Sequence, residues 1–243
     1  MIIIGVIPAR IGSTRLPGKP LRDILGKPMI QWVYETAKSS ELIDRVIVAT
    51  DDKSIVDAVT AFGGEAVLTD SSHPNGSSRI AQVVEAIECD LVVNIQGDEP
   101  MLGKEDINAA VRALMARKDA VASTLCIPVS EDSYDDPGVV KVVSRMDGRA
   151  LYFSRSIIPF ARHPRLLPVY EHVGVYVYRR DFLLKYAKLA PSPLEVAESL
   201  EQLRILEYGY DIVLAEVSRN QPQVSVDTEK DLERVIELMK GRM

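Results

Sequence analysis

Three cationic side chains gather in one glycine-containing segment near the N-terminus, residues 8–20 (PARIGSTRLPGKP). Arg10, Arg15 and Lys19 can pair with phosphate oxygens, and the two glycines allow the backbone to approach a ligand closely. The spacing is neither that of the GxxxxGKS/T phosphate loop nor that of the GxGxxG dinucleotide loop. Because prolines hold the arginines more firmly than a merely solvated basic loop requires, the segment predicts phosphate binding by a loop of another kind.

The charge of a triphosphate determines how many cations such a loop needs. One cation at about 4 Å contributes roughly 4 kcal/mol of Coulomb energy at an effective dielectric constant near 20, before desolvation. A single cation would not hold several negative charges, whereas three cations together with a metal ion could.

Two carboxylates could bind that metal ion. Asp98 lies in residues 96–100 (QGDEP), after the most β-rich run of the chain, and the following Glu-Pro pair is restricted to an extended turn. Mg²⁺ prefers hard oxygen ligands, usually one or two carboxylates and substrate phosphates. A DEP turn by itself would be ordinary surface structure. Asp227, in residues 224–228 (VSVDT), is the second candidate, although the pattern alone favours a helix N-cap at this position.

The elements that hold these loops are predicted by short apolar runs that alternate with helical patterns. Strands are expected at residues 2–7, 45–50, 66–68 and 91–95, with helices between them. Continuously apolar strands separated by helices predict an α/β fold, with a mostly parallel sheet covered by helices on both faces. Ligands of such sheets bind beyond the carboxyl ends of the strands, which is where residues 8–20 and 96–100 lie.

The pattern changes after residue 127, where strands are expected at 139–143, 150–153 and 173–178. It returns to a helical region at 195–208, a strand at 211–217 and a helix at 228–240. The sequence therefore predicts an α/β core from residues 1–127 and 193–243. It predicts a smaller β-rich lobe, inserted at residues 128–192.

Composition excludes several classes of protein. The formal net charge of −6 argues against nonspecific binding of nucleic acid. Cys89 and Cys126 are the only cysteines, which excludes a disulfide framework and predicts a reducing compartment. The apolar run at residues 1–8 is too short to span a membrane and lacks the features of a signal peptide, so a cytoplasmic protein is expected.

The chain resembles the 3-deoxy-manno-octulosonate (Kdo) cytidylyltransferase family in six segments that occur in order between residues 4 and 238. These segments are IPARIGSTRLPGKPL, NIQGDEP, LYFSRSIIPF, EHVGVYVYRRDFL, SPLEVAESLEQLRILEYGY and SVDTEKDLERV. The resemblance implies a nucleotide-diphospho-sugar-transferase-like (Rossmann-like) fold and a cytoplasmic homodimer. It also implies that the lobe at residues 128–192 serves sugar binding and dimerisation. It also implies that the anomeric hydroxyl of Kdo attacks the α-phosphorus of CTP with Mg²⁺ as cofactor. The products would be pyrophosphate and CMP-Kdo for lipopolysaccharide synthesis.

The resemblance also implies roles for particular residues. It assigns four residues to catalysis: Arg15, Lys19, Asp98 and Asp227. The last two are the expected Mg²⁺ ligands, which reverses the N-cap interpretation of Asp227. The nucleotide would contact Pro8, Ala9, Arg10, Ser13, Arg15, Lys19, Ala122, Ser123 and Thr124. The sugar would contact Arg79, Gln96, Arg155, His172, Tyr176, Glu201 and Gln202.

Two of the sugar residues have alternative interpretations. His172 could be a structural histidine, although Tyr176, four residues further along the same expected strand, should point to the same face. Arg155 could instead anchor the lobe to the core.

One segment departs from the family pattern. The family usually has Ser-Gly-Thr-Asp/Glu-Arg where this chain has Asn75-Gly76-Ser77-Ser78-Arg79. Loss of a carboxylate beside the sugar site could change which sugar is accepted, so a related acidic 3-deoxy-ulosonic acid such as 8-amino-Kdo is an alternative substrate. The metal carboxylates are unaffected.

A noncatalytic nucleotide-sugar-binding protein on the same fold is the alternative from another class, because fold alone does not determine activity. Such a protein would be expected to lack a metal carboxylate or a triphosphate cation. All five of these residues are present in the sequence: Arg10, Arg15, Lys19, Asp98 and Asp227.

Overall fold

The computed structural model describes residues 1–163, 167–218 and 224–241. Two compact units make up the chain. Unit 1 consists of Met1–Asn108, Arg179–Ala187 and Gln221–Met243, and unit 2 consists of Ala109–Tyr178 and Lys188–Asn220. These units do not coincide with the predicted core and lobe, because residues 109–127 and 193–218 group with the β-rich part of the chain.

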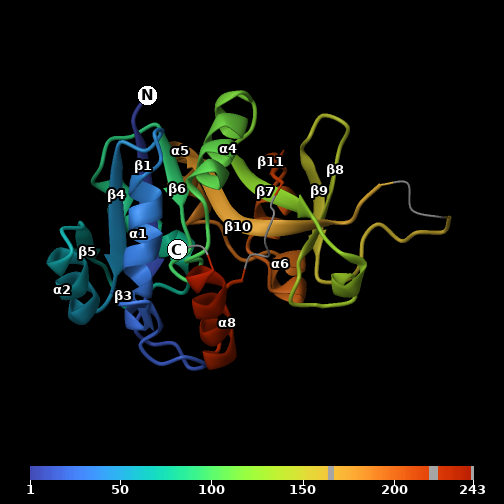
Figure 1. The fold of residues 1–243 in the computed structure, drawn as a ribbon. Helices are drawn as coiled ribbons and strands as arrows, with labels where there is room; N and C mark the ends of the chain where they lie inside the picture. The colour runs from blue at the N-terminus through green and yellow to red at the C-terminus, as the bar shows by residue number, and fades with distance from the viewer. Residues whose placement is uncertain (164–166, 219–223, 242–243) are drawn as a thin grey trace. The chain divides into compact units, whose positions relative to one another are not determined.

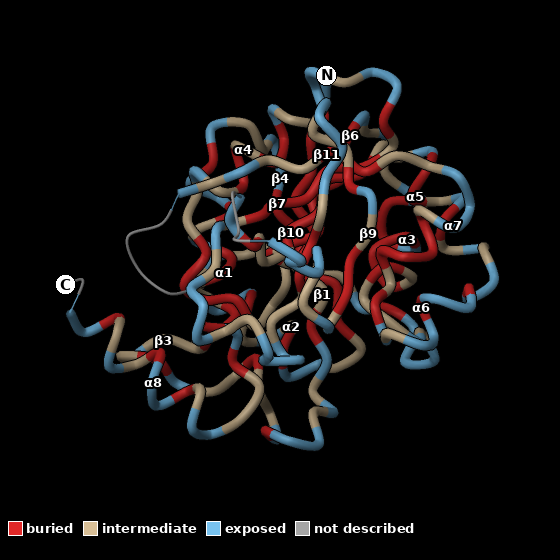
Figure 2. Tube along the Cα trace, turned by 90° about the vertical axis from the view of Figure 1, so that its right-hand side faces the viewer, coloured by how far each residue is buried: buried red, intermediate tan, exposed pale blue. Residues whose placement is uncertain are grey.

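Unit 1 contains a parallel sheet in the order β6-β1-β4-β5 (Figure 1). Its strands are β1 (Ile3–Ala9), β4 (Arg45–Thr50), β5 (Ala66–Leu68) and β6 (Leu91–Asn94). All four residues of β6 are buried, and so are six of the seven in β1. Strands that are apolar on both faces must be covered on both, and Figure 2 shows α1 and α3 on opposite sides of β1. The predicted α/β class with a mostly parallel sheet is confirmed.

Among the described residues, three helices of unit 1 alternate with these strands along the chain, and two more come after the last strand. They are α1 (Met29–Lys38), α2 (Lys53–Ala61), α3 (Gly76–Glu85), α5 (Arg180–Tyr186) and α8 (Glu229–Lys240). The short strands β2 (Asp23–Ile24) and β3 (Lys27–Pro28) form a separate antiparallel pair. We call residues 8–20 the basic loop. One buried apolar cluster joins Leu16 of this loop to Met29 of α1 and to Leu232 and Val235 of α8. The basic loop is therefore fixed to the C-terminal helix, which the sequence pattern did not indicate.

Unit 2 is a mixed sheet with two short helices. Its elements are β7 (Ala122–Pro128), β8 (Lys141–Ser144), β9 (Ala150–Ser154), β10 (Tyr170–Arg179), β11 (Ile212–Glu216), α6 (Pro193–Glu198) and α7 (Gln202–Glu207). β7 pairs in parallel with β11 and antiparallel with β10, while β8 pairs antiparallel with both β9 and β10. The pairing of β7 with β10 and β11 explains why this unit extends beyond the predicted lobe.

Some elements differ from the prediction. The helical region at 195–208 is divided into α6 and α7, because Ser199 has a left-handed backbone conformation (φ 52°) that ends α6. The helix α4 (Lys104–Met115), in which the two units meet along the chain, was not predicted from the pattern, and neither was α5.

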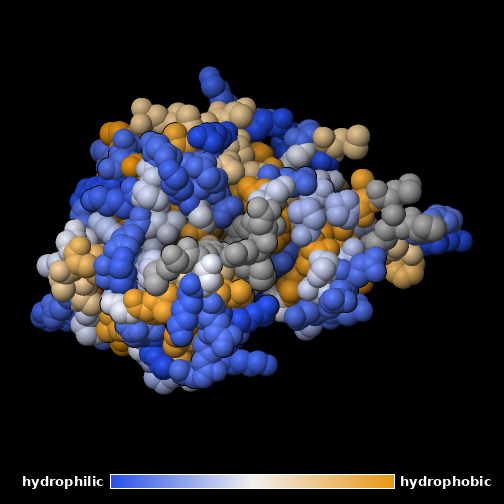
Figure 3. All heavy atoms as spheres, viewed as in Figure 1, coloured by the Kyte–Doolittle hydropathy of each residue, from blue (hydrophilic) through white to orange (hydrophobic). Residues whose placement is uncertain are grey.

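The surface drawn in Figure 3 is mostly hydrophilic, with smaller separate hydrophobic areas. In unit 2 the exposed large hydrophobic side chains include Leu151, Leu194 and Val196. Within the described ranges, no helix has the length and apolar character needed to cross a membrane.

Candidate active site

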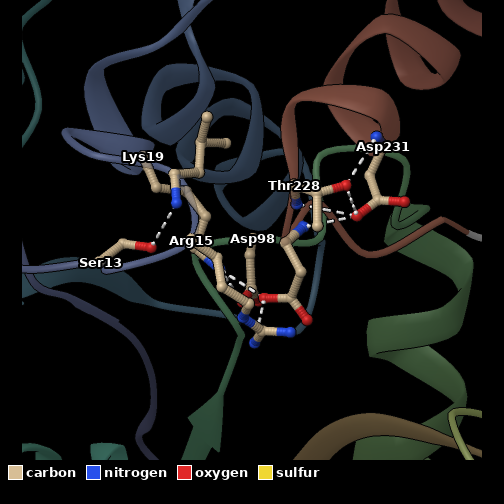
Figure 4. Close-up of polar contacts among 8 residues, drawn as sticks. Ser13, Arg15, Lys19, Asp98, Thr228 and Asp231 are labelled. Atoms are coloured by element: carbon tan, nitrogen blue, oxygen red, sulfur yellow. Dashed lines mark hydrogen bonds and ion pairs between the residues drawn. The ribbon is translucent and has the colours of Figure 1, made fainter.

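The basic loop leaves the carboxyl end of β1 and is held by its own hydrogen bonds. The Ser13 hydroxyl accepts a hydrogen bond from the Leu16 backbone amide at 3.2 Å (Figure 4). Leu16 is buried, and Gly18 supplies a left-handed turn (φ 66°) before the 3₁₀ helix Lys19–Leu21. These contacts fix the backbone at Arg15 and Lys19, whereas Arg10 is exposed on the same loop.

Residues 96–100, which we call the acidic loop, follow the carboxyl end of β6 and pass close to β1. A Cβ atom at Gly97 would lie 3.0 Å from the Pro8 carbonyl oxygen, so any other residue here would crowd the backbone of β1. The Asp98 carbonyl oxygen accepts a hydrogen bond from the Val226 amide at 2.9 Å. Asp98 and Asp227, which are far apart in the sequence, are therefore brought together by the backbone.

Two cations and two carboxylates meet at these loops. Lys19 Nζ lies 2.7 Å from Asp98 Oδ2 and 3.0 Å from Asp227 Oδ1, and Arg15 lies 3.0 Å from the same Asp227 oxygen (Figure 4). Burial alone would lower the pKa of the Lys19 ammonium, but the charge of Asp98 and the hydrogen bonds to both carboxylates raise it. We call these four residues the charged quartet; it contains all the predicted catalytic residues.

Asp227 is not the N-cap of α8, so the interpretation that the pattern alone favoured is wrong. The cap is Thr228, whose hydroxyl accepts a hydrogen bond from the Asp231 amide. Asp231 Oδ2 in turn accepts from the Thr228 amide at 2.8 Å, which completes a capping box (Figure 4). Because its neighbour caps the helix, the carboxylate of Asp227 is available to the charged quartet.

Arg79, which is predicted to contact the sugar, is buried in the first turn of α3. Its guanidinium donates to Thr69 Oγ1 at 2.6 Å and to Asp51 Oδ2 at 2.9 Å. Thr69 Oγ1 donates in turn to the Thr50 carbonyl oxygen at the end of β4. Asp51 and Thr69 were not among the predicted site residues. The only sequence signal for Asp51 was its place directly after a predicted strand, where Asp52 proves to be the cap of α2.

Ser78, at the position where the chain departs from the family pattern, belongs to the cap of α3. Its amide donates to Asn75 Oδ1 at 2.9 Å, and its hydroxyl donates to the Asn75 carbonyl oxygen at 3.0 Å. An Asp or Glu three residues after a cap residue is typical of a capping box. The departure therefore affects how α3 begins, and the side chain of Ser78 already has a local partner.

In unit 2, three of the predicted residues form one cluster. The rings of His172 and Tyr176 lie 5.3 Å apart, which confirms that they share a face of β10. His172 Nε2 lies 2.9 Å from Thr124 Oγ1, and the rings of His172 and Phe153 form a T-shaped pair with their centroids 5.2 Å apart. Desolvation lowers the pKa of His172 to about 3, so its imidazole is neutral at physiological pH.

The tautomer of His172 follows from the partners of Thr124. The Thr124 hydroxyl lies 2.8 Å from the Val175 carbonyl oxygen and has only one hydrogen to donate. We therefore assign the proton of His172 to Nε2, which donates to Thr124, and this leaves Nδ1 as an acceptor.

Other predicted residues are held by the backbone. Arg155 donates to the carbonyl oxygens of Pro137, Glu198 and Ser199 in unit 2, and it thereby orders the turn before Glu201. The Ser123 hydroxyl donates to the Ala110 carbonyl oxygen in the core. The remaining positions are plainly placed: Ala9, Ala122 and Gln202 are buried, while Pro8, Gln96 and Glu201 are partly exposed.

The chemistry of the charged quartet fits Mg²⁺. Asp98 and Asp227 supply hard oxygen donors. The Lys19 ammonium already lies between the two carboxylates, so a positive charge is accommodated at this position. In the part of the chain that the structure describes, no group of three or more His, Cys, Asp or Glu residues could hold a metal ion. Mg²⁺ usually takes one or two carboxylates and completes its coordination with substrate phosphates and water, which these two carboxylates would allow.

Comparison with known proteins defines the class. The sequence pattern of the family described as Cytidylyltransferase matches residues 4–212. The chain belongs to the cytidylyltransferase family.

Individual relatives give a more specific comparison than the family pattern does. The chain is 46% identical over 242 residues to the 3-deoxy-manno-octulosonate cytidylyltransferase of Fusobacterium nucleatum, covering 99% of this chain and 98% of the relative. It is 46% identical to the enzyme of the same name from Escherichia coli, covering 96% and 94%. A solved structure of CMP:2-keto-3-deoxy-manno-octonic acid synthetase complexed with CTP superposes with a TM-score of 0.96 at 44% identity and covers all of both chains.

Proposed function

We propose that this chain transfers the cytidylyl group of CTP to Kdo and releases pyrophosphate, with Mg²⁺ as cofactor. The charged quartet carries this proposal, because it combines two cations that can bind phosphate with two carboxylates that can hold a metal ion, beside the carboxyl ends of β1 and β6. The relatives that support the choice of sugar are similar over nearly their whole length.

The residues of unit 1 would act on the triphosphate. Arg10, Ser13, Arg15 and Lys19 would bind its oxygens, and alignment with charge neutralisation is most of what phosphoryl chemistry requires of a protein. Asp98 and Asp227 would hold the metal ion. When bound, Mg²⁺ would lower the pKa of the attacking hydroxyl and offset charge on the α-phosphate.

The sugar would be recognised by complementary polar groups. The fixed guanidinium of Arg79 can pair with the carboxylate of the sugar, and Gln96 offers an amide. The Nδ1 atom of neutral His172 would accept a hydrogen bond from a sugar hydroxyl, beside the ring of Tyr176. Glu201 and Gln202 follow the turn that Arg155 orders. We propose that Ala122 and Thr124 approach the nucleotide together with Ser123, whose hydroxyl is engaged elsewhere and which would contribute backbone.

Kdo is preferred over 8-amino-Kdo for a local reason. Ser78 motivated the alternative, yet its hydroxyl and amide both serve the cap of α3. A role in lipopolysaccharide synthesis, a cytoplasmic location and a homodimer remain proposals from the family resemblance. The exposed apolar side chains of Leu151, Leu194 and Val196 could contribute to a dimer interface.

The decisive experiment measures pyrophosphate release with each of the four nucleoside triphosphates, and with Kdo or 8-amino-Kdo, at several Mg²⁺ concentrations. We expect release with CTP and Kdo, and loss of release when the metal is chelated. Equal rates with both sugars would contradict the choice of Kdo, and silence with every pair would contradict the proposed reaction.

The same assay tests the metal carboxylates. Asp98→Asn keeps the volume of the side chain but weakens a metal ligand, so we expect a folded variant that has lost most activity and needs more Mg²⁺. Glu229→Gln is the matched control, because Glu229 is a nearby carboxylate that pairs with Arg22 instead. Wild-type turnover of Asp98→Asn at limiting Mg²⁺ would contradict the metal site.

A further inference from the structure

The two carboxylates that would bind the metal ion are already paired with the two cations that would bind the triphosphate. Lys19 contacts both Asp98 and Asp227, and Arg15 contacts Asp227. The two positive charges balance the two negative ones, so the charged quartet is neutral as it stands. A metal ion arriving alone must displace an ammonium or guanidinium group, and a triphosphate arriving alone must take these cations from their carboxylates.

The side chains can make this exchange without moving the backbone. Leu16 and Pro20, on either side of Lys19 in the chain, are buried and hold the loop. Lys19 has a flexible four-carbon stem with a single charged end, and the side chain of Arg15 is 65% exposed. The backbone at Asp98 and Asp227 is held by the hydrogen bond between Asp98 and Val226 and by the capping box of α8, and each carboxylate lies at the end of a short side chain. The carboxylates are therefore the fixed partners and the cations are the mobile ones.

We propose that Lys19 and Arg15 are exchangeable counter-ions of the metal carboxylates, which a triphosphate draws away so that the metal ion can replace them. This inference rests on the proposed function, because it takes Asp98 and Asp227 as metal ligands. Each ion pair that is broken is replaced by another: ammonium with phosphate, and carboxylate with metal. The exchange is favourable only when both ligands arrive.

The consequence is reciprocal coupling between the two ligands. If the triphosphate strengthens metal binding at the carboxylates, the metal must strengthen triphosphate binding by the same factor. The carboxylates are thereby protected from metal ions until a nucleotide is present. Such coupling predicts that a metal ion binds more tightly when Lys19 is replaced. It also predicts that metal-free CTP binds more tightly when both carboxylates are replaced.

The first test measures Mn²⁺ binding to the full chain without nucleotide, by the electron paramagnetic resonance signal of free Mn²⁺. Lys19→Met removes the competing ammonium, so we expect about tenfold tighter binding than in the wild type. Arg22→Met is the control: it removes a neighbouring cation whose partner, Glu229, is not a metal carboxylate. It should bind Mn²⁺ as the wild type does.

The second test measures CTP binding calorimetrically in the presence of a chelator. The double variant Asp98→Asn/Asp227→Asn frees Lys19 and Arg15, so we expect it to bind metal-free CTP about tenfold more tightly than the wild type. Glu229→Gln, which frees Arg22 only, should leave the affinity unchanged. The calorimetric experiment does not use a variant of Lys19. It therefore still tests the counter-ion exchange if Lys19→Met fails to fold.

Unchanged Mn²⁺ affinity in folded Lys19→Met, or unchanged CTP affinity in the double variant, would overturn the inference. The Mg²⁺ requirement of Asp98→Asn in the pyrophosphate assay separates this failure from that of the proposed function. If that requirement is raised, the metal site stands and only the counter-ion exchange falls. If it is unchanged, the carboxylates do not hold the metal and both proposals fall.

Discussion

At the scale of single residues, the environment of each ionisable group decides what it can do. Lys19 lies between two carboxylates, which raise the pKa of its ammonium despite burial, so it stays a cation for phosphate. His172 lies among rings and one hydroxyl, and desolvation lowers its pKa to about 3. It is suited to accept a hydrogen bond from a hydroxyl but not to act as an acid near neutral pH.

The pKa of His172 predicts how the stability of the protein depends on pH. The ordinary value of 6.5 applies to the unfolded chain, so between pH 6.5 and about 3 the unfolded state binds the proton and the folded state does not. This histidine therefore contributes full stability above pH 6.5 and less as the pH falls, by at most about 1.4 kcal/mol per unit.

We expect His172→Asn to lose this pH-dependent contribution to the free energy of unfolding. Urea unfolding of the wild type and the variant at pH 7.5 and 5 would measure it, because effects of other groups cancel in the difference between the two proteins. At pH 5 the unfolding free energy of the variant should be higher, relative to that of the wild type, than it is at pH 7.5. A difference that does not change with pH would contradict a His172 that stays neutral in the folded protein.

At the scale of elements, helix caps do more than end helices. The capping box of Thr228 and Asp231 begins α8 and at the same time leaves Asp227 directed towards Lys19. The cap of α3 at Asn75 similarly begins the turn that holds Arg79. Strand ends and helix starts thus supply most of the site in unit 1, as is usual for parallel sheets.

Thr228→Ala should reduce both stability and metal affinity. Loss of the cap hydroxyl should cost about 1 kcal/mol of unfolding free energy. It should also raise the Mg²⁺ concentration needed for half-maximal pyrophosphate release, because Asp227 loses its fixed orientation. Thr228→Ser retains the hydroxyl and should restore both properties. A stability loss with an unchanged Mg²⁺ requirement would show that the cap does not position Asp227.

At the scale of the whole molecule, the site residues are distributed over two compact units. Unit 1 contains the charged quartet and Arg79, and unit 2 contains the cluster of His172, Tyr176 and Thr124. Because the quartet already balances its own charge, the fold of unit 1 does not need a metal ion to neutralise these two carboxylates. Metal binding should therefore be linked to the substrate and not to folding.

Chelation should leave the thermal unfolding temperature unchanged while it abolishes pyrophosphate release. CTP and Mg²⁺ together should raise that temperature, since a ligand at a hundredfold excess over its Kd stabilises the folded state by about 2.7 kcal/mol. Differential scanning calorimetry of the full chain with chelator, with Mg²⁺, and with both ligands would measure this. A marked fall on chelation alone would indicate a structural metal ion instead.

The sequence by itself determined the class of the fold and the places where chemistry could occur. Strands 45–50 and 66–68 were predicted with the bounds that the structure has. In the first of them five of the six residues are buried, so its apolar β-branched run reports local burial directly. Family segments around residues 8–20 and 96–100 indicated the cytidylyltransferase chemistry. Local patterns could not predict α4 or α5, and they could not separate α6 from α7.

Only the tertiary structure decided which residues meet. Lys19 and Asp227 are separated by 208 positions, and Arg79 and Asp51 by 28. The helix-cap pattern even favoured the wrong role for Asp227, since Thr228 next to it is an equally good cap. Periodicity reports how each segment is buried, but the pairing of side chains from distant loops depends on strand order and on the packing of Leu16 against α8. These are properties of the folded chain as a whole, so no local pattern contains them.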